Sequence, residues 1–144
     1  MTTKPPMSPA EAKAVRTPLT PLARDLLAGP NFATVATINR DGSPQQSIVW
    51  VDEREGDVIF STVKGRAKYR NLSRDPRIGL VIVDRNDGYR YCELRGVARL
   101  EDENADALID ELSRKYRGRA WVETQTRPRV NVLVTVTHIN DYQE

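Results

Sequence analysis

The chain has 144 residues, of which 39% are hydrophobic and 29% charged, and its 22 basic and 20 acidic residues give a formal net charge of +2. A chain of this length can bury roughly 70% of its unfolded surface as one domain, which excludes disorder of the whole chain. One cysteine and one histidine exclude an internal disulfide and a structural zinc site of four Cys or His ligands. The sequence has no secretory signal and no membrane-spanning apolar stretch, so we expect a cytoplasmic protein.

The first half of the chain predicts an arm, a helix and three strands. Residues 1–18 are rich in proline and poor in large apolar residues, which predicts a flexible arm before a single domain over 19–144. Thr20-Pro21 begins a predicted helix that extends over about 20–28. The β-branched runs at 32–38, 45–51 and 57–63, separated by the turns NRDG and EREG, predict an antiparallel meander.

The second half predicts two more helices and three more strands. A helix-compatible segment ends at Asp75-Pro76, because the residue before proline avoids the helical region. Strands at 77–84 and 89–101 form a second hairpin, and apolar residues at helical spacing predict a helix over 102–117. The run VNVLVTVTHI is the last predicted strand. We therefore expect a mainly β fold, a six-stranded antiparallel barrel or sandwich with short helices.

Basic residues are concentrated in the segment KGRAKYRNLSR, residues 64–74, which contains no acid. Without its five cations, 17 basic residues remain against 20 acidic ones in the rest of the chain. The segment follows the hydroxyls of Ser61 and Thr62, and Gly65 would let the backbone approach an anion closely. A helix beginning near Arg66 would add free N–H groups. This pattern predicts a phosphate-binding site, and a basic helix with one solvated face is the alternative.

Three stretches of the sequence together resemble the pyridoxamine 5′-phosphate oxidase-like split β-barrel superfamily. They are FATVATINRDGSPQQSIVWV, DVIFSTVKGRAKYRNLSRDPRIGLVIVD and DGYRYCELRGVARLE. Within that superfamily they are most similar to the branch that uses the deazaflavin coenzyme F420. The resemblance covers about residues 20–142. It implies a six-stranded split barrel and a homodimer, with one cofactor in each of two grooves at the interface.

The resemblance also implies which residues bind the cofactor. Its phosphate end would lie on the strand-to-helix segment, at Ser61, Thr62, Lys64, Gly65, Arg66, Lys68 and Asn71. Its ring would lie along the second strand, at Gln45, Gln46, Ser47, Ile48 and Val49. On that strand Ser47 and Val49 point to one face and Ile48 and Trp50 to the other, so one row can contact a ligand while the other fills the barrel. An exposed polar pair is the alternative for the two glutamines.

A second subunit is also expected on physical grounds. The interior of so small a barrel is filled by its own side chains, so a tricyclic ring must bind outside, where a second chain can close the groove. Tyr89 and Tyr91, together with Arg127 or Arg129, are the candidates for the wall contributed by the partner. Ordinary packing within a strand is the alternative for the tyrosines.

The expected cofactor is F420, with FMN as the alternative. F420 continues into a lactyl-glutamyl tail whose carboxylates need further basic partners, and surplus positive charge is present at Arg70, Arg74, Arg114, Lys115, Arg117 and Arg119. Oxidation of pyridoxamine phosphate is not expected, because the true oxidases of the family have a longer C-terminal segment that grips the substrate phosphate.

The predicted reaction is hydride transfer from C5 of reduced F420 to a small electron-poor acceptor such as an enone, an imine or a tetrapyrrole. No catalytic residue is assigned; Tyr91 or solvent could deliver a proton, and neither Cys92 nor His138 is expected to be catalytic. A non-catalytic flavin or F420 carrier remains an alternative. A small nucleic-acid-binding barrel is disfavoured by an aromatic content of only 6%. We expect neither a metal ion nor a membrane partner.

Overall fold

The computed structural model describes residues 4–144, which form seven strands and four helices. The helices are α1 (Pro9–Ala14), α2 (Pro21–Ala28), α3 (Ala67–Arg74) and α4 (Ala105–Arg117). The strands are β1 (Phe32–Ile38), β2 (Pro44–Trp50), β3 (Asp52–Arg54), β4 (Asp57–Val63), β5 (Arg77–Asp84), β6 (Asp87–Glu101) and β7 (Arg129–Tyr142). The three helices and six strands expected from the sequence are all present, and α1 and β3 are additional.

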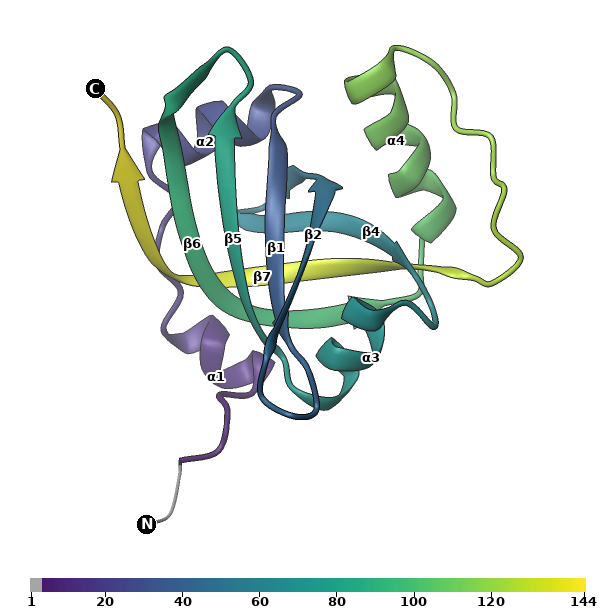
Figure 1. The fold of residues 1–144 in the computed structure, drawn as a ribbon, viewed down its shortest axis with the longest axis horizontal. Coiled ribbons are helices and arrows are strands. Elements are labelled where there is room, and N and C mark those ends of the chain that lie inside the picture. Colours follow the sequence, from purple (N-terminus) through teal and green to yellow (C-terminus); the bar gives the residue numbers. More distant parts are fainter. Residues whose placement is uncertain (1–3) are drawn as a thin grey trace.

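The strands form one curled antiparallel sheet in the order β2-β1-β5-β6-β7-β4-β3 (Figure 1). The two predicted hairpins, β1–β2 and β5–β6, are confirmed. The predicted meander is wrong at its third strand, because β4 pairs with β7 and not with β2. This pairing joins Val58 to Val134 and Val63 to Arg129, and it brings the start of the last strand beside the basic segment that follows β4.

The seventh strand, β3, corrects the expected count of six. Its residues, Asp52–Arg54, contain no β-branched side chain and were therefore expected to belong to a turn. They pair with β4 across a two-residue turn in which Glu55 and Gly56 have φ values of 52° and 84°. β2 and β3 are the two edges of the sheet, and only Val51 separates them in sequence. The chain therefore passes directly from one edge of the sheet to the other.

Curling of the sheet depends on Gly96 in the long strand β6. The register between β6 and β7 shifts between Arg95 and Gly96. A Cβ at Gly96 would lie 2.1 Å from the carbonyl oxygen of Thr135, so a side chain there would push the two strands apart. Arg95 pairs with His138 and Gly96 with Val136, so Thr137 is an extra residue on β7, and this bulge bends β7.

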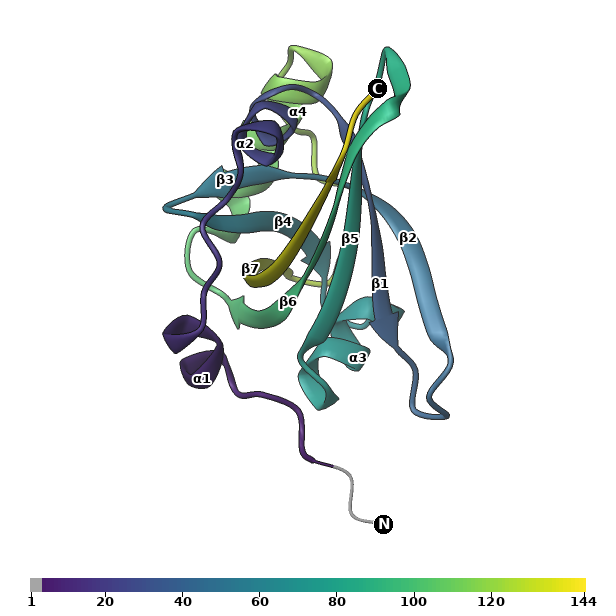
Figure 2. The same cartoon turned by 90° about the vertical axis from the view of Figure 1, so that its left-hand side faces the viewer.

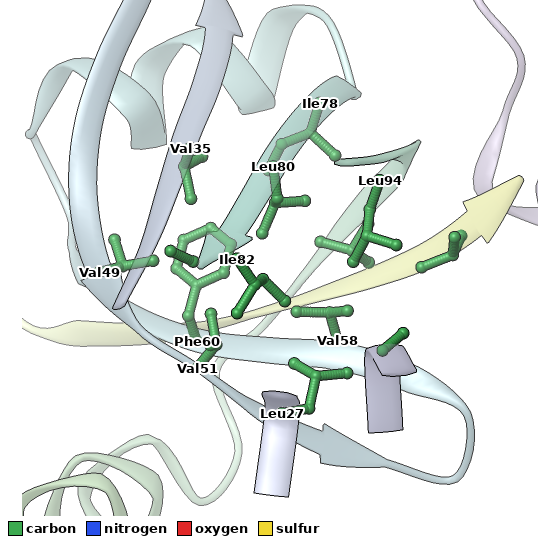
Figure 3. Packing of buried hydrophobic residues seen from close by; sticks show 14 of the residues in the cluster. Leu27, Val35, Val49, Val51, Val58, Phe60, Ile78, Leu80, Ile82 and Leu94 are labelled. Carbon is green, nitrogen blue, oxygen red and sulfur yellow. The ribbon is translucent and has the colours of Figure 1, made fainter. Parts of the chain in front are cut away.

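The barrel interior is filled by apolar side chains from all the longer strands (Figure 3). Phe60, Leu80, Ile82 and Leu94 are at most 2% exposed. Helix α2 covers one end of this core with four buried residues: Leu22, Ala23, Leu26 and Leu27. A small barrel packed in this way leaves no room for a ring inside it, so a ligand must bind on its outside.

Helix α4 packs on the outside of the barrel and forms a second, smaller core. Its Leu108 and Leu112 contact Ile59 of β4 and Leu133 of β7. The partly buried rings of Trp50 and Tyr116 pack against this cluster. The hydroxyl of Tyr116 accepts from the backbone N–H of Val51 at 2.9 Å, which fixes the C-terminal end of α4 at the junction of β2 and β3.

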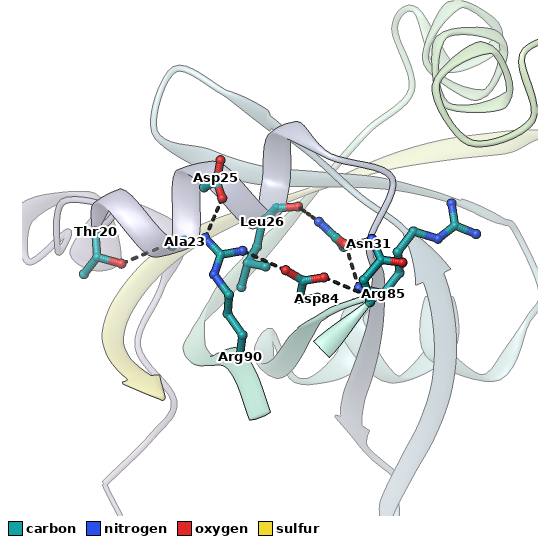
Figure 4. A network of polar contacts seen from close by, with 9 residues as sticks. Thr20, Ala23, Asp25, Leu26, Asn31, Asp84, Arg85 and Arg90 are labelled. Carbon is teal, nitrogen blue, oxygen red and sulfur yellow. Dashed lines mark hydrogen bonds and ion pairs between the residues drawn. The ribbon is translucent and has the colours of Figure 1, made fainter. Parts of the chain in front are cut away.

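A polar network attaches α2 to the β5–β6 hairpin (Figure 4). The guanidinium of Arg90 pairs with Asp25 on α2 at 2.5 Å and with Asp84 on β5 at 2.9 Å. The Asn31 side chain donates to the carbonyl of Leu26 and accepts from the backbone N–H of Arg85. The helix that covers this end of the core is therefore held by directed contacts as well as by apolar packing.

The N-terminal segment contains a helix where a flexible arm was expected. Ser8 and Glu11 form a capping box at the start of α1, and Ala12 is fully buried. Further along, the guanidinium of Arg16 pairs with Asp57 at 2.8 Å, and the N–H of Thr17 donates to β7. Figure 2 shows the extended segment that joins α1 to α2 at opposite ends of the barrel. The expectation is thus corrected for residues 9–17, while residues 1–3 lie outside the described part.

None of the helices within residues 4–144 has both the length and the apolar character needed to cross a bilayer.

Candidate functional site

An open groove of about 260 Å³ lies beside the barrel, where β2, β4, α3 and α4 approach the start of β7. The connection from α4 to β7, residues 118–128, runs around the outer side of this region (Figure 1). The groove is lined by Phe32, Ile48, Val49, Trp50, Ser61, Arg66, Lys68, Ile109, Leu112, Arg117, Trp121 and Arg129. Six of these lining residues were predicted from the sequence to contact a cofactor: Ile48, Val49, Ser61, Arg66, Lys68 and Arg129.

The turn from β4 into α3 presents the polar side of the groove. Gly65 has a φ of 98°, and a Cβ there would lie 2.1 Å from the guanidinium of Arg127. The positive φ favours glycine at this position, and a Cβ there would require the Arg127 side chain to move. Arg66 is the N-cap residue of α3 and lines the groove.

Lys68 is a buried cation in the groove, only 8% exposed. Its Nζ donates to the Ser47 hydroxyl at 3.2 Å, and within residues 4–144 it forms no ion pair. Burial lowers the pKa of Lys68, and the nearby charge of Arg66 lowers it further. A buried ammonium beside a second cation, with only a hydroxyl as partner, is the electrostatic arrangement expected of a site for an anion.

Arg129 enters the groove from the first residue of β7 and is also buried. Its Nε pairs with Glu123 Oε2 at 2.6 Å, and its Nη1 donates to the Ser61 hydroxyl at 3.4 Å. The pairing with Arg129 lowers the pKa of Glu123 to about 2. Arg129 was expected in a wall supplied by a partner subunit, but its side chain lines the groove of its own chain.

Aromatic rings form the other side of the groove. Trp50 stacks on Tyr116, with ring centroids 5.4 Å apart, and meets Trp121 edge-on at 5.9 Å. The guanidinium of Arg117 lies 4.9 Å from the centre of the Trp50 ring. Beside them, Ile48 is 67% exposed. This surface can accept a planar apolar group next to the cationic end of the groove.

Two predicted residues of the strand-to-helix segment point elsewhere. Thr62 is fully buried, because alternation along β4 turns it to the barrel interior, while Ser61 faces the groove. Lys64 pairs with Asp102 at 2.7 Å, which raises its pKa. Neither lines the groove, so the structure does not bring either of them to the site.

Asn71 and the two glutamines support the fold locally. The Asn71 amide donates to Thr37 and Asn39, both at 3.0 Å, and so attaches α3 to the β1–β2 hairpin. Gln45 accepts from the Thr37 hydroxyl at 3.2 Å, and Gln46 is exposed. On β2, Ile48 and Trp50 line the groove from one face of the strand, and Val49, which also lines it, belongs to the barrel core as well.

The predicted tyrosines lie outside the groove of their own chain. Tyr89 is 70% exposed, and Tyr91 stacks on Tyr142 with centroids 4.7 Å apart. Neither ring is among the groove-lining residues. Their role in a partner's groove therefore remains a prediction.

The basic residues at the end of α4 contact different parts of the protein. Arg114 pairs with Asp110 at 2.9 Å. Lys115 donates to the carbonyls of Leu27 and Val51 and so joins α4 to α2. Only Arg117 of this cluster lines the groove, and thus the cluster does not act as one anion site.

Sequence reasoning missed the contribution of Trp121 and of helix α4 to the groove. Trp121 lies in a polar loop, where a large aromatic residue was the only available signal. Ile109 and Leu112 were recognised as one face of a helix, but their proximity to β2 depends on how α4 packs. Within the described chain no three His, Cys, Asp or Glu side chains gather to hold a metal. Burial raises the pKa of Cys92 to about 12, so this thiol stays protonated.

Comparison with known proteins identifies relatives over nearly the whole domain. A family model described as pyridoxamine 5′-phosphate oxidase matches residues 19–142. A pyridoxine/pyridoxamine 5′-phosphate oxidase of Azorhizobium caulinodans is 34% identical over 103 residues, which cover 69% of this chain and 47% of the relative. The corresponding protein of a Jannaschia species is 29% identical over 106 residues, covering 69% and 51%. The chain therefore spans about half the length of the curated relatives that it matches.

Solved structures show the same fold. An F420 reductase superposes with a TM-score of 0.73 at 27% identity, covering 81% of this chain and 94% of the reductase. A conserved hypothetical protein of Mycobacterium tuberculosis superposes with a TM-score of 0.72 at 22% identity, covering 90% and 88%. The match to the family model extends from two residues before α2 to the end of β7, and it includes every strand that forms the groove. The chain therefore belongs to the pyridoxamine 5′-phosphate oxidase family of split-barrel oxidoreductases.

Proposed function

We propose that the protein binds a phosphorylated flavin-type cofactor in this groove, with F420 favoured over FMN, and reduces a small electron-poor acceptor. The observation that carries the proposal is Lys68, a buried ammonium that within residues 4–144 is held only by the Ser47 hydroxyl and that lies beside Arg66. Burying an unpaired charge is costly unless an anion joins it. A cofactor phosphate would supply that anion.

The residues of the groove fit such a ligand. Arg66 and Arg129 carry guanidinium groups, each of which can bind two phosphate oxygens. The hydroxyl of Ser61 on β4 accepts from Arg129 and faces the same groove. The exposed Ile48 and the ring of Trp50 offer apolar surface to a planar ring system. Cationic and aromatic surfaces thus meet in one groove, as a phosphorylated tricyclic cofactor requires.

Positive charge that continues along α3 favours F420. Arg66, Arg70 and Arg74 recur every four residues on this helix, so they follow one face over about 12 Å. Arg70 and Arg74 line a second hollow together with Arg40. A ligand with carboxylates beyond its phosphate would use this charge, whereas FMN would not. The F420 reductase among the similar structures, at 27% identity, supports the same choice.

The chemistry of the reaction belongs to the cofactor, which when bound supplies or accepts a hydride. The chain's own residues bind and orient it. Lys68 and Arg66 would hold the anionic end, Ile48 and Trp50 would contact the apolar end, and Trp121 would exclude water at the side next to α4. Positioning and charge complementarity are the contributions that these residues can make.

A homodimer would complete the groove. Ile48, Thr34 and Val81 are aligned across β2, β1 and β5 on the outer face of the sheet. Ile48 is 67% exposed and Val81 36% exposed. Because Ile48 also lines the groove, a second copy seated on this outer face would cover the apolar residues and close the groove at the same time.

Titration of the purified protein with F420, FMN and riboflavin, followed by tryptophan fluorescence, tests the proposed cofactor. We expect F420 to bind most tightly and riboflavin, which lacks the phosphate, most weakly. Arg66→Ala should weaken binding of F420 and FMN. Lys64→Ala should have the smaller effect, because Lys64 is already paired with Asp102. Equal affinity for FMN and riboflavin would contradict the phosphate site.

Turnover separates an enzyme from a carrier. Reduced F420 bound to the protein should be oxidised faster when an enone, imine or tetrapyrrole acceptor is added. Pyridoxamine 5′-phosphate belongs in the same panel with FMN, because the curated relatives are named for its oxidation. Tight binding without acceleration by any acceptor would favour the carrier.

A further inference from the structure

Arg129 differs from the other cations of the groove because it already forms an ion pair with a carboxylate. Its side chain is 6% exposed, and its Nε lies 2.6 Å from Glu123 Oε2. Within residues 4–144, Arg66, Lys68 and Arg117 form no such ion pair, although all three line the same groove. An acidic side chain from residues 118–128 is therefore already paired with one of the cations that line the groove.

The same carboxylate organises the loop that carries it. Glu123 Oε2 accepts from the indole N–H of Trp121 at 2.7 Å, and Oε1 accepts from the backbone N–H of Gln125 at 3.0 Å. The Arg129 guanidinium lies 4.8 Å from the centre of the Trp121 ring. Release of Glu123 from Arg129 would therefore change the surroundings of Trp121, which itself lines the groove.

We propose that Glu123 is an internal competitor for the anion site: it occupies Arg129 in the free protein, and an entering phosphate displaces it and moves Trp121. The inference rests on the proposed phosphate site but does not depend on which cofactor carries the phosphate. On this proposal, the position of the loop formed by residues 118–128 depends on whether a phosphate is bound at the anion site.

Charge and exposure make this exchange feasible. A phosphate dianion carries more charge than a carboxylate and can bind Arg129 while it also reaches Lys68 and Arg66. The Glu123 side chain is 37% exposed, so water can solvate its carboxylate when it leaves. Because the pKa of Glu123 is lowered to about 2, the carboxylate is ionised at neutral pH. The competition is thus present under all ordinary conditions.

The test follows the fluorescence emission of Trp121 itself. The chain has two tryptophans, so Trp50→Phe leaves Trp121 as the single emitting indole. This protein is titrated with sodium phosphate at constant ionic strength, with sodium chloride as the balancing salt. The titration is repeated after Glu123→Gln, after Lys68→Met, and after Glu111→Gln, which removes the same charge from an exposed position on α4.

We expect phosphate to shift the Trp121 emission, and Glu123→Gln to resemble the phosphate-bound spectrum before any phosphate is added. Glu123→Gln should also tighten the apparent affinity for phosphate about fivefold, the effect of losing a competing ion pair worth about 1 kcal/mol. Glu111→Gln should match the parent protein in both measurements.

Two results would overturn the proposal, and they differ in what else they affect. If Lys68→Met abolishes phosphate binding while Glu123→Gln leaves affinity and emission unchanged, Glu123 does not compete, and the proposed phosphate site stands. If phosphate neither binds nor shifts the Trp121 emission, the internal competitor and the phosphate site fail together.

Discussion

Replacing Lys68 with methionine should separate ligand binding from stability. Methionine keeps an unbranched apolar stem of similar length but removes the charge. In the free protein Lys68 is 8% exposed, and among the residues that the structure describes its ammonium has only the Ser47 hydroxyl as a partner. Removing a buried, poorly paired charge should stabilise the free protein by about 1 kcal/mol, which corresponds to a rise in Tm of about 3 °C for a domain of this size.

The same substitution should weaken binding of a phosphorylated ligand. A hydrogen bond to a charged group contributes about 1.5–3 kcal/mol, so loss of the ammonium should raise the Kd for F420 or FMN by about 10- to 150-fold. Binding of riboflavin should change much less, because it has no phosphate for Lys68 to contact. We expect a residue of a binding site to behave in this way: it lowers the stability of the free protein but strengthens the binding of one class of ligand.

Thermal unfolding and fluorescence titration of the two proteins measure both effects, with Lys13→Met on the exposed surface of α1 as the charge-matched control. The difference in the free energy of unfolding between the unsubstituted protein and Lys68→Met should also depend on pH. The pKa of Lys68 is lowered in the folded protein, so the penalty is fully present below that lowered pKa and disappears as pH rises through the ordinary lysine range. A Lys68→Met protein that is several kcal/mol less stable, or that binds FMN unchanged, would refute this reasoning.

Three further predictions follow from single positions. Gly65→Ala should lower the free energy of unfolding by about 1–3 kcal/mol, and by more than Gly42→Ala, which has a similar φ of 88° but open space around it; urea denaturation of both compares them. The stabilising effect of Glu123 relative to Glu123→Gln should be present above about pH 4.5 and be lost as pH falls toward 2; a difference that is constant from pH 7 to 3 would contradict it. Ile48→Lys should convert the proposed dimer into a monomer by light scattering, while Val122→Lys, at an exposed apolar position in the α4–β7 loop, should leave the proposed dimer intact.

Most elements could be predicted because their signals lie within a few residues. Thr20 caps α2 and Gly29 ends it, as the sequence indicates. The hairpins β1–β2 and β5–β6 follow from alternating runs around short turns. The capping box at Ser8 was also a local signal, and it was overlooked because the surrounding prolines suggested an arm without structure.

Pairing between distant strands could not be predicted in this way. The meander expected through β4 continued the order of the chain, whereas β4 pairs with β7, whose residues follow some 70 positions later. That pairing buries Phe60 and Val58 of β4 against β7 in the barrel core. The choice depends on the whole barrel closing around one core, which no local pattern expresses.

The concentration of cations in residues 64–74 was determined by the sequence alone, and the structure places this segment at the turn between β4 and α3 and along α3. Which cations face the groove was decided only by the tertiary structure. Lys68 is buried and has no ion pair within the described residues, whereas Lys64 pairs with Asp102. Arg129 comes from a distant part of the chain and is paired with Glu123. The reason is physical: the charge of a side chain is local, but its burial and its partners depend on segments that meet only when the barrel closes.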